Sequence, residues 1–250
     1  MSNAREARPS LVRSFQGWWR ETYVAQGLVR AFRSCLLVLW TFLRESTPAS
    51  RRQRYGDMEY DWDYRVDTTS AAVGWRDRLL GLLHSPYQPS EPALFHEMLH
   101  SVPIDYQKFT FVDVGSGKGR ALLMAADYPF QRIVGVELLP ELHRIAQDNL
   151  RKYSSATQRC FNIESQCANA RTFEFPQEPI MLYLFNPLPQ PALQQMLNNL
   201  EHSLHQYPRE VYLLYHNPLL EHVLSRLDWL EKRCETHQYC VYAARFTPQE

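Results

Sequence analysis

From residue 109 onward, the chain alternates short apolar runs with amphipathic stretches. The runs at 109–114 and 132–136 predict buried strands, and a stretch with helical periodicity follows each of them. The alternation continues toward the C-terminus, with strands expected near 160–165, 180–185 and 210–215 and helices at about 190–204 and 218–228. Strands separated by helices predict an α/β fold, in which helices cover both faces of a mostly parallel sheet.

Two more features complete the expected elements of this region. The β-rich runs at 229–234 and 239–246 are separated by a short polar turn, which predicts a C-terminal β-hairpin. Ahead of the first strand we expect two short helices, at 71–84 and 91–101. Ser90 is a suitable N-cap for the second of these helices.

The N-terminal part of the chain has a different pattern. Residues 1–46 have a helical pattern in which bulky aromatic residues are interleaved with arginines. We expect a basic helical extension with its linker over 1–56, followed by a domain over 57–250. The extension could pack its apolar face on the domain, dock on a partner, or lie in a membrane interface as basic amphipathic helices with tryptophans do.

Composition and charge narrow the protein class. The chain is 45% hydrophobic and 22% charged, as expected of a globular protein, and its net charge is zero. That balance hides an asymmetry, because the first 54 residues contain ten arginines and only three glutamates. The longest apolar run, 34–43, is about half the ~20 residues that span a bilayer. Five scattered cysteines without a C-x-x-C pair indicate reduced thiols in a cytoplasmic protein.

Two motifs suggest metal binding, and both are incomplete. His96 and His100 fit the zinc motif H-E-x-x-H, but Pro103 ends the helix soon afterwards and no third ligand follows at the usual spacing. The acidic stretch 57–63 resembles a calcium loop. However, Trp62 stands where the loop needs glycine and Thr68 where it needs glutamate. We expect no metal site.

A glycine-rich turn has a more complete context. The sequence Asp113-Val114-Gly115-Ser116-Gly117-Lys118-Gly119 lies between a predicted strand and a predicted helix. Glycines allow a tight turn and let backbone N–H groups approach a ligand closely. A P-loop is excluded because Gly119 replaces the Ser or Thr that follows the lysine. The dinucleotide fingerprint fits poorly because Arg120 replaces its third glycine.

The turn resembles motif one, D-x-G-x-G-x-G, of the class I S-adenosylmethionine-dependent methyltransferases. The resemblance covers roughly residues 85–246 and includes Glu137, the acidic residue that ends the second strand. It implies a Rossmann-like fold with a mostly parallel seven-stranded sheet and a cofactor-binding core at 105–250. It also implies that S-adenosylmethionine is the cofactor and that Glu137 holds its ribose. The implied cofactor-binding residues are Asp113, Gly115, Ser116, Gly117, Gly119, Glu137, Asn169 and Ala170.

The resemblance also suggests where the methyl acceptor binds. Asn186 and Pro187, after the fourth strand, are similar to the start of the Asn-Pro-Pro-aromatic motif of amino-methylating enzymes, although Leu188 and Pro189 replace its second half. They are the candidate catalytic residues. Tyr87 and Phe185 are candidate substrate contacts, because Tyr87 precedes motif one as a tyrosine does in class I protein-lysine methyltransferases.

These features predict a methyltransferase whose acceptor is a protein amine, with lysine as the first candidate and a small molecule as the second. A nucleic-acid acceptor is less favoured because residues outside the extension are not basic. The competing hypothesis is a non-catalytic module that binds S-adenosylmethionine or a partner. The sequence leaves the oligomeric state open.

Overall fold

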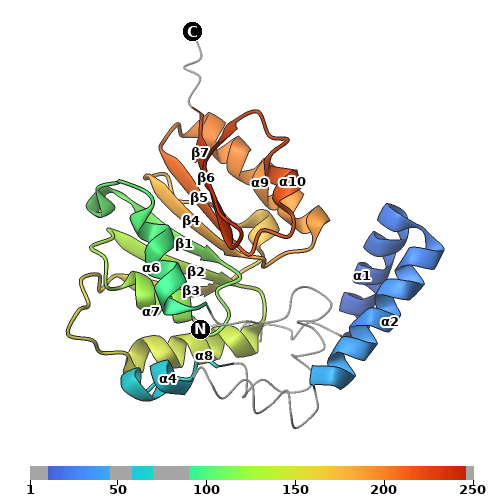
Figure 1. The fold of residues 1–250 in the computed structure, drawn as a ribbon, viewed down its shortest axis with the longest axis horizontal. Coiled ribbons are helices and arrows are strands. Elements are labelled where there is room, and N and C mark those ends of the chain that lie inside the picture. The colour runs from blue at the N-terminus through green and yellow to red at the C-terminus, as the bar shows by residue number, and fades with distance from the viewer. Residues whose placement is uncertain (1–10, 46–57, 70–89, 246–250) are drawn as a thin grey trace, which may run out of the picture.

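The computed structural model describes residues 11–45, 58–69 and 90–245. Tyr87 and the helix expected at 71–84 lie outside these ranges. The described chain contains an α/β domain and, beside it, a pair of N-terminal helices (Figure 1).

The α/β domain is built on a seven-stranded sheet with the order β3-β2-β1-β4-β5-β7-β6. The first five strands of this order run parallel, whereas β7 is antiparallel to β5 and β6 is antiparallel to β7. This topology confirms the predicted α/β fold and the C-terminal hairpin. The strands are β1 (Thr110–Val114), β2 (Arg132–Glu137), β3 (Ile163–Cys167), β4 (Ile180–Phe185), β5 (Val211–His216), β6 (Leu230–Glu235) and β7 (Tyr239–Ala244).

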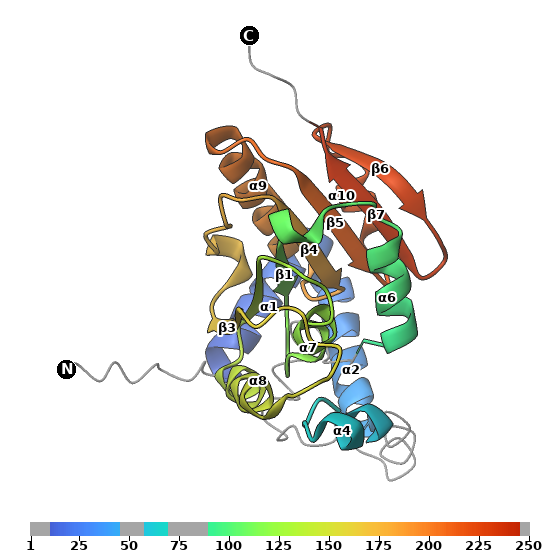
Figure 2. The ribbon, with the colours of Figure 1, turned by 90° about the vertical axis from the view of Figure 1, so that its left-hand side faces the viewer.

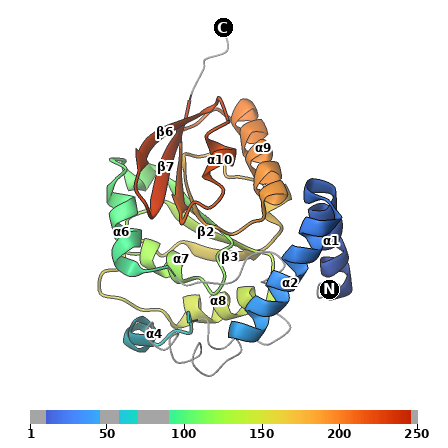
Figure 3. The ribbon, with the colours of Figure 1, turned by 45° about the vertical axis from the view of Figure 1, so that its right-hand side comes forward.

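Helices cover both faces of the sheet, as predicted. Figures 2 and 3 show α6 and α9 on opposite sides of it. Along β1, Phe111 packs in the core cluster beneath α6 and α7, and Val112 packs in the cluster beneath α9. This alternation follows from the two-residue period of a strand. The helices are α6 (Pro92–His100), α7 (Arg120–Ala125), α8 (Pro140–Lys152), α9 (Gln190–Gln206) and α10 (Glu221–Leu224).

Three local predictions need correction. The strand expected near 160–165 is shifted, because pairing with β2 begins only at Ile163. The helix expected at 218–228 is the shorter α10, because turns held by Leu219 N–H and Glu221 N–H occupy the residues before it. Ser90 does not cap α6. Glu91 is at the N-cap position, and the Ser90 hydroxyl bonds to Tyr183 instead.

The basic extension forms two helices, α1 (Leu11–Gln26) and α2 (Leu28–Glu45). They are separated at Gly27, whose φ of +79° ends the first helix. The two helices contact each other and form a hairpin, seen at the right of Figure 1. No helix in the described ranges is long and apolar enough to cross a membrane.

Residues 58–69 are fixed to the helices that follow β1 and β2. This segment contains α4 (Met58–Tyr64), and its last residues contact Lys118, which is fully buried. Lys118 Nζ donates to Asp67 Oδ1 at 2.7 Å and to the carbonyl of Thr69 at 2.5 Å. Asn149 of α8 bonds to both backbone groups of Asp67. A short segment far away in the sequence is thereby held against the glycine turn.

The acidic residues that resemble a calcium loop also serve this attachment. The Asp61 carboxylate accepts hydrogen bonds from the backbone N–H groups of Thr68 and Thr69. It also lies 3.6 Å from the guanidinium of Arg120, and that group stacks over the ring of Tyr60 at 4.8 Å. Asp61 therefore organises its own loop and pairs with a buried cation.

We expect the Lys118–Asp67 pair to stabilise the fold measurably. Asp67→Ala would leave the buried ammonium with one carbonyl partner, so the free energy of unfolding should fall by about 2 kcal/mol. This value is below that of a fully buried pair, because the Asp67 side chain is 45% exposed. Urea unfolding measures the change. Asp148→Ala, which breaks surface ion pairs with Arg144 and Arg151, is the control and should lower the free energy of unfolding by at most about 0.5 kcal/mol. Equal effects of the two variants would contradict the expectation.

Candidate functional site

The glycine turn joins the carboxyl end of β1 to the start of α7. Gly119 is the N-cap of α7, with a φ of +86°. The N–H groups of Gly115 and Ser116 both donate to the carbonyl of Val136, at 2.8 and 3.2 Å. The turn is therefore fastened to the end of β2, one residue before Glu137.

Gly115 brings the turn into contact with the loop that follows β4. A Cβ built on Gly115 would lie 2.4 Å from the Cβ of Pro187, and its φ is +77°. No other residue type fits this space without moving the loop. The structure therefore places Asn186 and Pro187, the predicted catalytic residues, directly beside the predicted cofactor turn.

Glu137 is held in a fixed orientation at the end of β2. Its Oε2 accepts from Gly117 N–H and its Oε1 from Leu139 N–H, both at 2.8 Å. Burial raises the pKa of the Glu137 carboxyl, and the backbone donors oppose that rise. A carboxylate has about four acceptor positions, so the backbone donors leave room for hydroxyl groups of a ligand.

Asp113 and Ser116 carry buried polar atoms that other described residues leave unpaired. Asp113 is only 4% exposed, and no hydrogen bond to its carboxylate comes from the described residues. Burial, followed by the charge of Glu137, raises the pKa of Asp113 well above its usual value. The hydroxyl of Ser116 is also buried without a partner in this part of the chain. Unsatisfied groups of this kind fit a ligand that carries hydrogen-bond donors and a positive charge.

Asn169 and Ala170 follow β3 and lie next to Glu137 along the sheet edge. Ala168 N–H donates to the carbonyl of Glu137 at 3.0 Å, which fixes this neighbourhood. Asn169 is exposed, and its side-chain oxygen accepts from Arg171 N–H at 3.1 Å. Ala170 is buried in the core cluster beneath α9. The amide nitrogen of Asn169 is the group left to recognise a ligand.

An aromatic and polar cluster lies at the carboxyl ends of β4 and β5. Phe185 and His216 are paired in the register of these strands, and their rings stack 3.9 Å apart with an interplanar angle of 6°. His216 Nδ1 and the Tyr183 hydroxyl are 2.8 Å apart, and the same hydroxyl lies 2.8 Å from Ser90 Oγ. Burial lowers the pKa of His216 to about 4, so the imidazole is neutral at physiological pH.

The backbone of Asn186 adopts a left-handed conformation with a φ of +45°. Asn is among the few non-glycine residues that tolerate this region. The Tyr215 hydroxyl donates to Asn186 Oδ1 at 3.2 Å and accepts from Leu220 N–H at 3.3 Å. The side chain of Asn186 is therefore oriented by the strand next to it.

The H-E-x-x-H side chains have other partners. His96 Nδ1 lies 2.8 Å from the Tyr128 hydroxyl, and His100 Nε2 lies 3.5 Å from the same oxygen. Tyr239 donates to Glu97 Oε1 at 3.0 Å. Among the described residues, no three or more His, Cys, Asp or Glu side chains lie close enough together to hold a metal ion.

Sequence reasoning missed two supports of the site. Gly135 in β2 allows Ser116 to approach, because a Cβ there would lie 2.7 Å from Ser116 Oγ. A glycine inside a strand signals such a close approach. The contact of Tyr183 with Ser90 joins residues 93 positions apart, for which the sequence carries no signal.

Comparison with known proteins supplies the deciding observation. Residues 111–206 match a family model described as a methyltransferase domain. This part of the chain is a methyltransferase domain. The matched region includes the glycine turn, Glu137 and the loop after β4, the parts for which the sequence predicts contact with S-adenosylmethionine and the methyl acceptor.

Solved structures of similar fold include proteins with different acceptors. The 23S rRNA methyltransferase ErmE is 14% identical, with a TM-score of 0.46, and the match covers 65% of this chain and 71% of that one. A predicted N6-adenine-specific DNA methylase from Listeria monocytogenes is 15% identical, with a TM-score of 0.48 and coverages of 64% and 52%. A precorrin-6y C5,15-methyltransferase from Geobacter metallireducens is 16% identical, with a TM-score of 0.46 and coverages of 62% and 87%. A search of curated protein sequences finds no match.

The methyltransferase domain should bind S-adenosylhomocysteine through Glu137. Glu137→Ala should raise the dissociation constant at least about tenfold, because a charge-assisted hydrogen bond contributes more than 1.4 kcal/mol. Calorimetric titration measures the constant. His96→Ala is the control and should leave it unchanged, since His96 bonds to Tyr128 instead of the turn. If His96→Ala abolished binding and Glu137→Ala did not, the assignment of the glycine turn would be wrong.

Asp113→Asn should stabilise the protein at pH 8 while weakening binding of S-adenosylmethionine. Because the folded-state pKa of Asp113 is raised, the native protein bears a buried charge above that pKa and gains stability as the pH falls through it. The variant lacks this charge. Its melting temperature at pH 8 should exceed that of the native sequence by at least about 2 °C, and the gap should narrow as the pH is lowered. Thermal unfolding followed by circular dichroism measures the melting temperatures, and calorimetric titration measures binding. Asp63→Asn, at an exposed position, is the control, and a lower melting temperature for Asp113→Asn at pH 8 would refute the argument.

Proposed function

We propose that this methyltransferase domain transfers the methyl group to an amine nitrogen, with a protein lysine as the first candidate acceptor. The observation that carries the proposal is the position of Asn186. Its loop contacts the cofactor turn through Pro187 and Gly115, and its Oδ1 is oriented by Tyr215. A side-chain carbonyl oxygen at this point can accept a hydrogen from an amine and align the lone pair of the nitrogen.

The stacked rings of Phe185 and His216 support an amine acceptor. Aromatic faces attract cations, and Phe185 is only partly buried. His216 is neutral, so it adds no positive charge that would repel an ammonium group. When bound, S-adenosylmethionine supplies an activated methyl group on a sulfonium. The protein must then hold the amine in line and favour its neutral form.

The charge of the domain favours a cationic acceptor. The chain as a whole is neutral and its first 54 residues carry a net charge of +7, so residues 55–250 carry −7. Such a surface attracts lysine-rich segments and repels phosphate-rich nucleic acid. A small amine is the second candidate, since the charge and the aromatic pair suit it equally.

Methyl transfer to poly-L-lysine from radiolabelled S-adenosylmethionine tests the proposal. The native chain should label poly-L-lysine but not the same polymer after acetylation of its amines. Asn186→Ala should lower kcat by about 10²-fold, because it removes an oriented acceptor from the reacting nitrogen, and should change binding of S-adenosylhomocysteine little. His202→Ala, on α9, is the control and should match the native rate.

Other outcomes separate the remaining hypotheses. Labelling of a small amine such as cadaverine, with none of poly-L-lysine, would move the acceptor to the small-molecule class. Labelling of RNA alone would refute the proposal that the acceptor is an amine of a protein or of a small molecule. Tight binding of S-adenosylhomocysteine with no transfer to any of the three would support the non-catalytic module.

A further inference from the structure

The α1–α2 hairpin exposes an unusual amount of apolar surface. Eight of its large apolar side chains are exposed, including Val24 at 77% and Val29 at 82%. The others are Phe15, Tyr23, Leu28, Phe32, Leu36 and Leu37. In a soluble domain such residues occur singly, and a contiguous group of them marks a binding surface.

The exposed residues follow the helical period. On α2, Leu28, Phe32 and Leu36 are spaced four residues apart, so they lie along one stripe, and Val29 adjoins it. Fully buried Ala31 projects about 100° from Phe32 and marks a different face of the helix. The exposed stripe is therefore distinct from the packed face of α2.

The first helix carries an aromatic stripe with the same spacing. Phe15, Trp19 and Tyr23 are four residues apart, and Phe15 and Trp19 stack with ring centroids 6.2 Å apart. Trp18 lies 5.9 Å from Phe15, so the three rings form one cluster. Tryptophan and tyrosine rings prefer the boundary between headgroups and acyl chains.

The positive charge of the hairpin indicates which kind of partner binds these apolar stripes. Arg20, Arg30 and Arg33 are exposed on the hairpin, and no described residue forms an ion pair with them. Arg30 and Arg33 lie within one turn of the apolar stripe of α2, where their long side chains can extend to anionic headgroups while the apolar residues insert. The whole segment 1–54 carries a net charge of +7, which suits an anionic surface.

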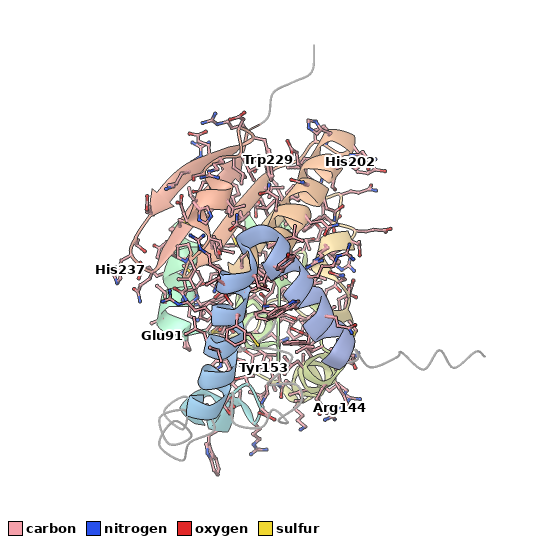
Figure 4. All side chains as sticks on the ribbon, turned by 90° about the vertical axis from the view of Figure 1, so that its right-hand side faces the viewer. Glu91, Arg144, Tyr153, His202, Trp229 and His237 are labelled. Atoms are coloured by element: carbon pink, nitrogen blue, oxygen red, sulfur yellow. The ribbon has the colours of Figure 1, made fainter. Side chains whose placement is uncertain are left out.

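The hairpin lies to one side of the α/β domain, where a flat surface can reach it (Figures 1 and 4). Neither helix can span a bilayer, so contact with lipid would be along the helices in the plane of the interface. Lipid is favoured over a protein partner because residues 1–54 contain ten arginines and only three glutamates, a cationic excess that matches a layer of anionic headgroups.

We propose that α1 and α2 together form a docking surface for anionic phospholipid, which holds the methyltransferase domain at a membrane. The apolar stripes insert between the headgroups, and the arginines bind lipid phosphates or carboxylates. Methyl transfer plays no part in this contact, so the proposal stands or falls separately from the proposed acceptor.

Sedimentation of the full chain with vesicles tests the proposal. Binding to vesicles of phosphatidylcholine with 30% phosphatidylglycerol should be at least about tenfold tighter than binding to phosphatidylcholine alone, and 0.5 M salt should weaken it. The double variant Arg30→Gln/Arg33→Gln should lose at least tenfold in affinity for the anionic vesicles. Phe32→Gln/Leu36→Gln should lose a similar factor in affinity, because it removes apolar side chains that insert between the headgroups.

A matched control lies on the domain. Phe161 is 78% exposed outside the hairpin, so Phe161→Gln removes an exposed aromatic residue without touching the proposed surface and should bind vesicles as the native chain does. Circular dichroism confirms that each variant is folded. No binding to anionic vesicles, or equal loss in Phe161→Gln, would overturn the proposal. A third result would also overturn the proposal. If the native chain is a dimer, and Phe32→Gln/Leu36→Gln makes it a monomer without changing sedimentation with vesicles, a second copy of the chain covers the stripes instead of lipid.

Discussion

The contact between Gly115 and Pro187 links the two halves of the site. Pro187 fills the space where any other residue at position 115 would place its Cβ, so the turn after β1 and the loop after β4 fit together only with glycine there. Since β1 and β4 are neighbours in the sheet, their carboxyl ends already lie side by side. The contact then fixes the position of the two loops relative to each other at this edge of the sheet. The glycine turn and Asn186, the proposed cofactor and acceptor sides of the site, are consequently parts of a single packed unit.

That unit contains groups that work against folding. The carboxyl groups of Asp113 and Glu137 are both buried, and each has a pKa raised first by burial. Glu137 recovers part of the lost hydration through two backbone donors, whereas Asp113 receives no hydrogen bond from the described residues. Binding sites commonly retain such polar groups for a ligand, at the expense of stability. Lys118, in the same turn, acts in the opposite sense, because its bonds to Asp67 and Thr69 tie the turn to residues 58–69.

The sequence predicts those parts of the site that depend on residues close together in the chain. The order of strand, glycine turn and helix around Asp113 is readable because the period of the apolar residues changes from two to about 3.6 within a few residues. Contacts of long sequence separation carry no such signal. In the sequence, Lys118 and Arg120 are only positions in or beside the glycine-rich motif, yet the structure buries them against a segment about 50 residues earlier. Serine is a common N-cap residue, so the sequence predicts that Ser90 caps α6. In the structure the Ser90 hydroxyl lies within hydrogen-bond distance of the Tyr183 hydroxyl on β4 and pairs with it instead.

The opposite charges of the extension and the domain have a joint consequence. A membrane with anionic lipid attracts the α1–α2 hairpin, whose segment carries +7, and repels residues 55–250, which carry −7. The two forces would turn the domain away from the lipid while the hairpin holds it nearby. An acidic domain in that orientation presents its surface to the surrounding solution, where it would attract the lysine-rich acceptor of the proposed function. Because both attractions are electrostatic, high salt would weaken the docking of the hairpin and the recruitment of such an acceptor together.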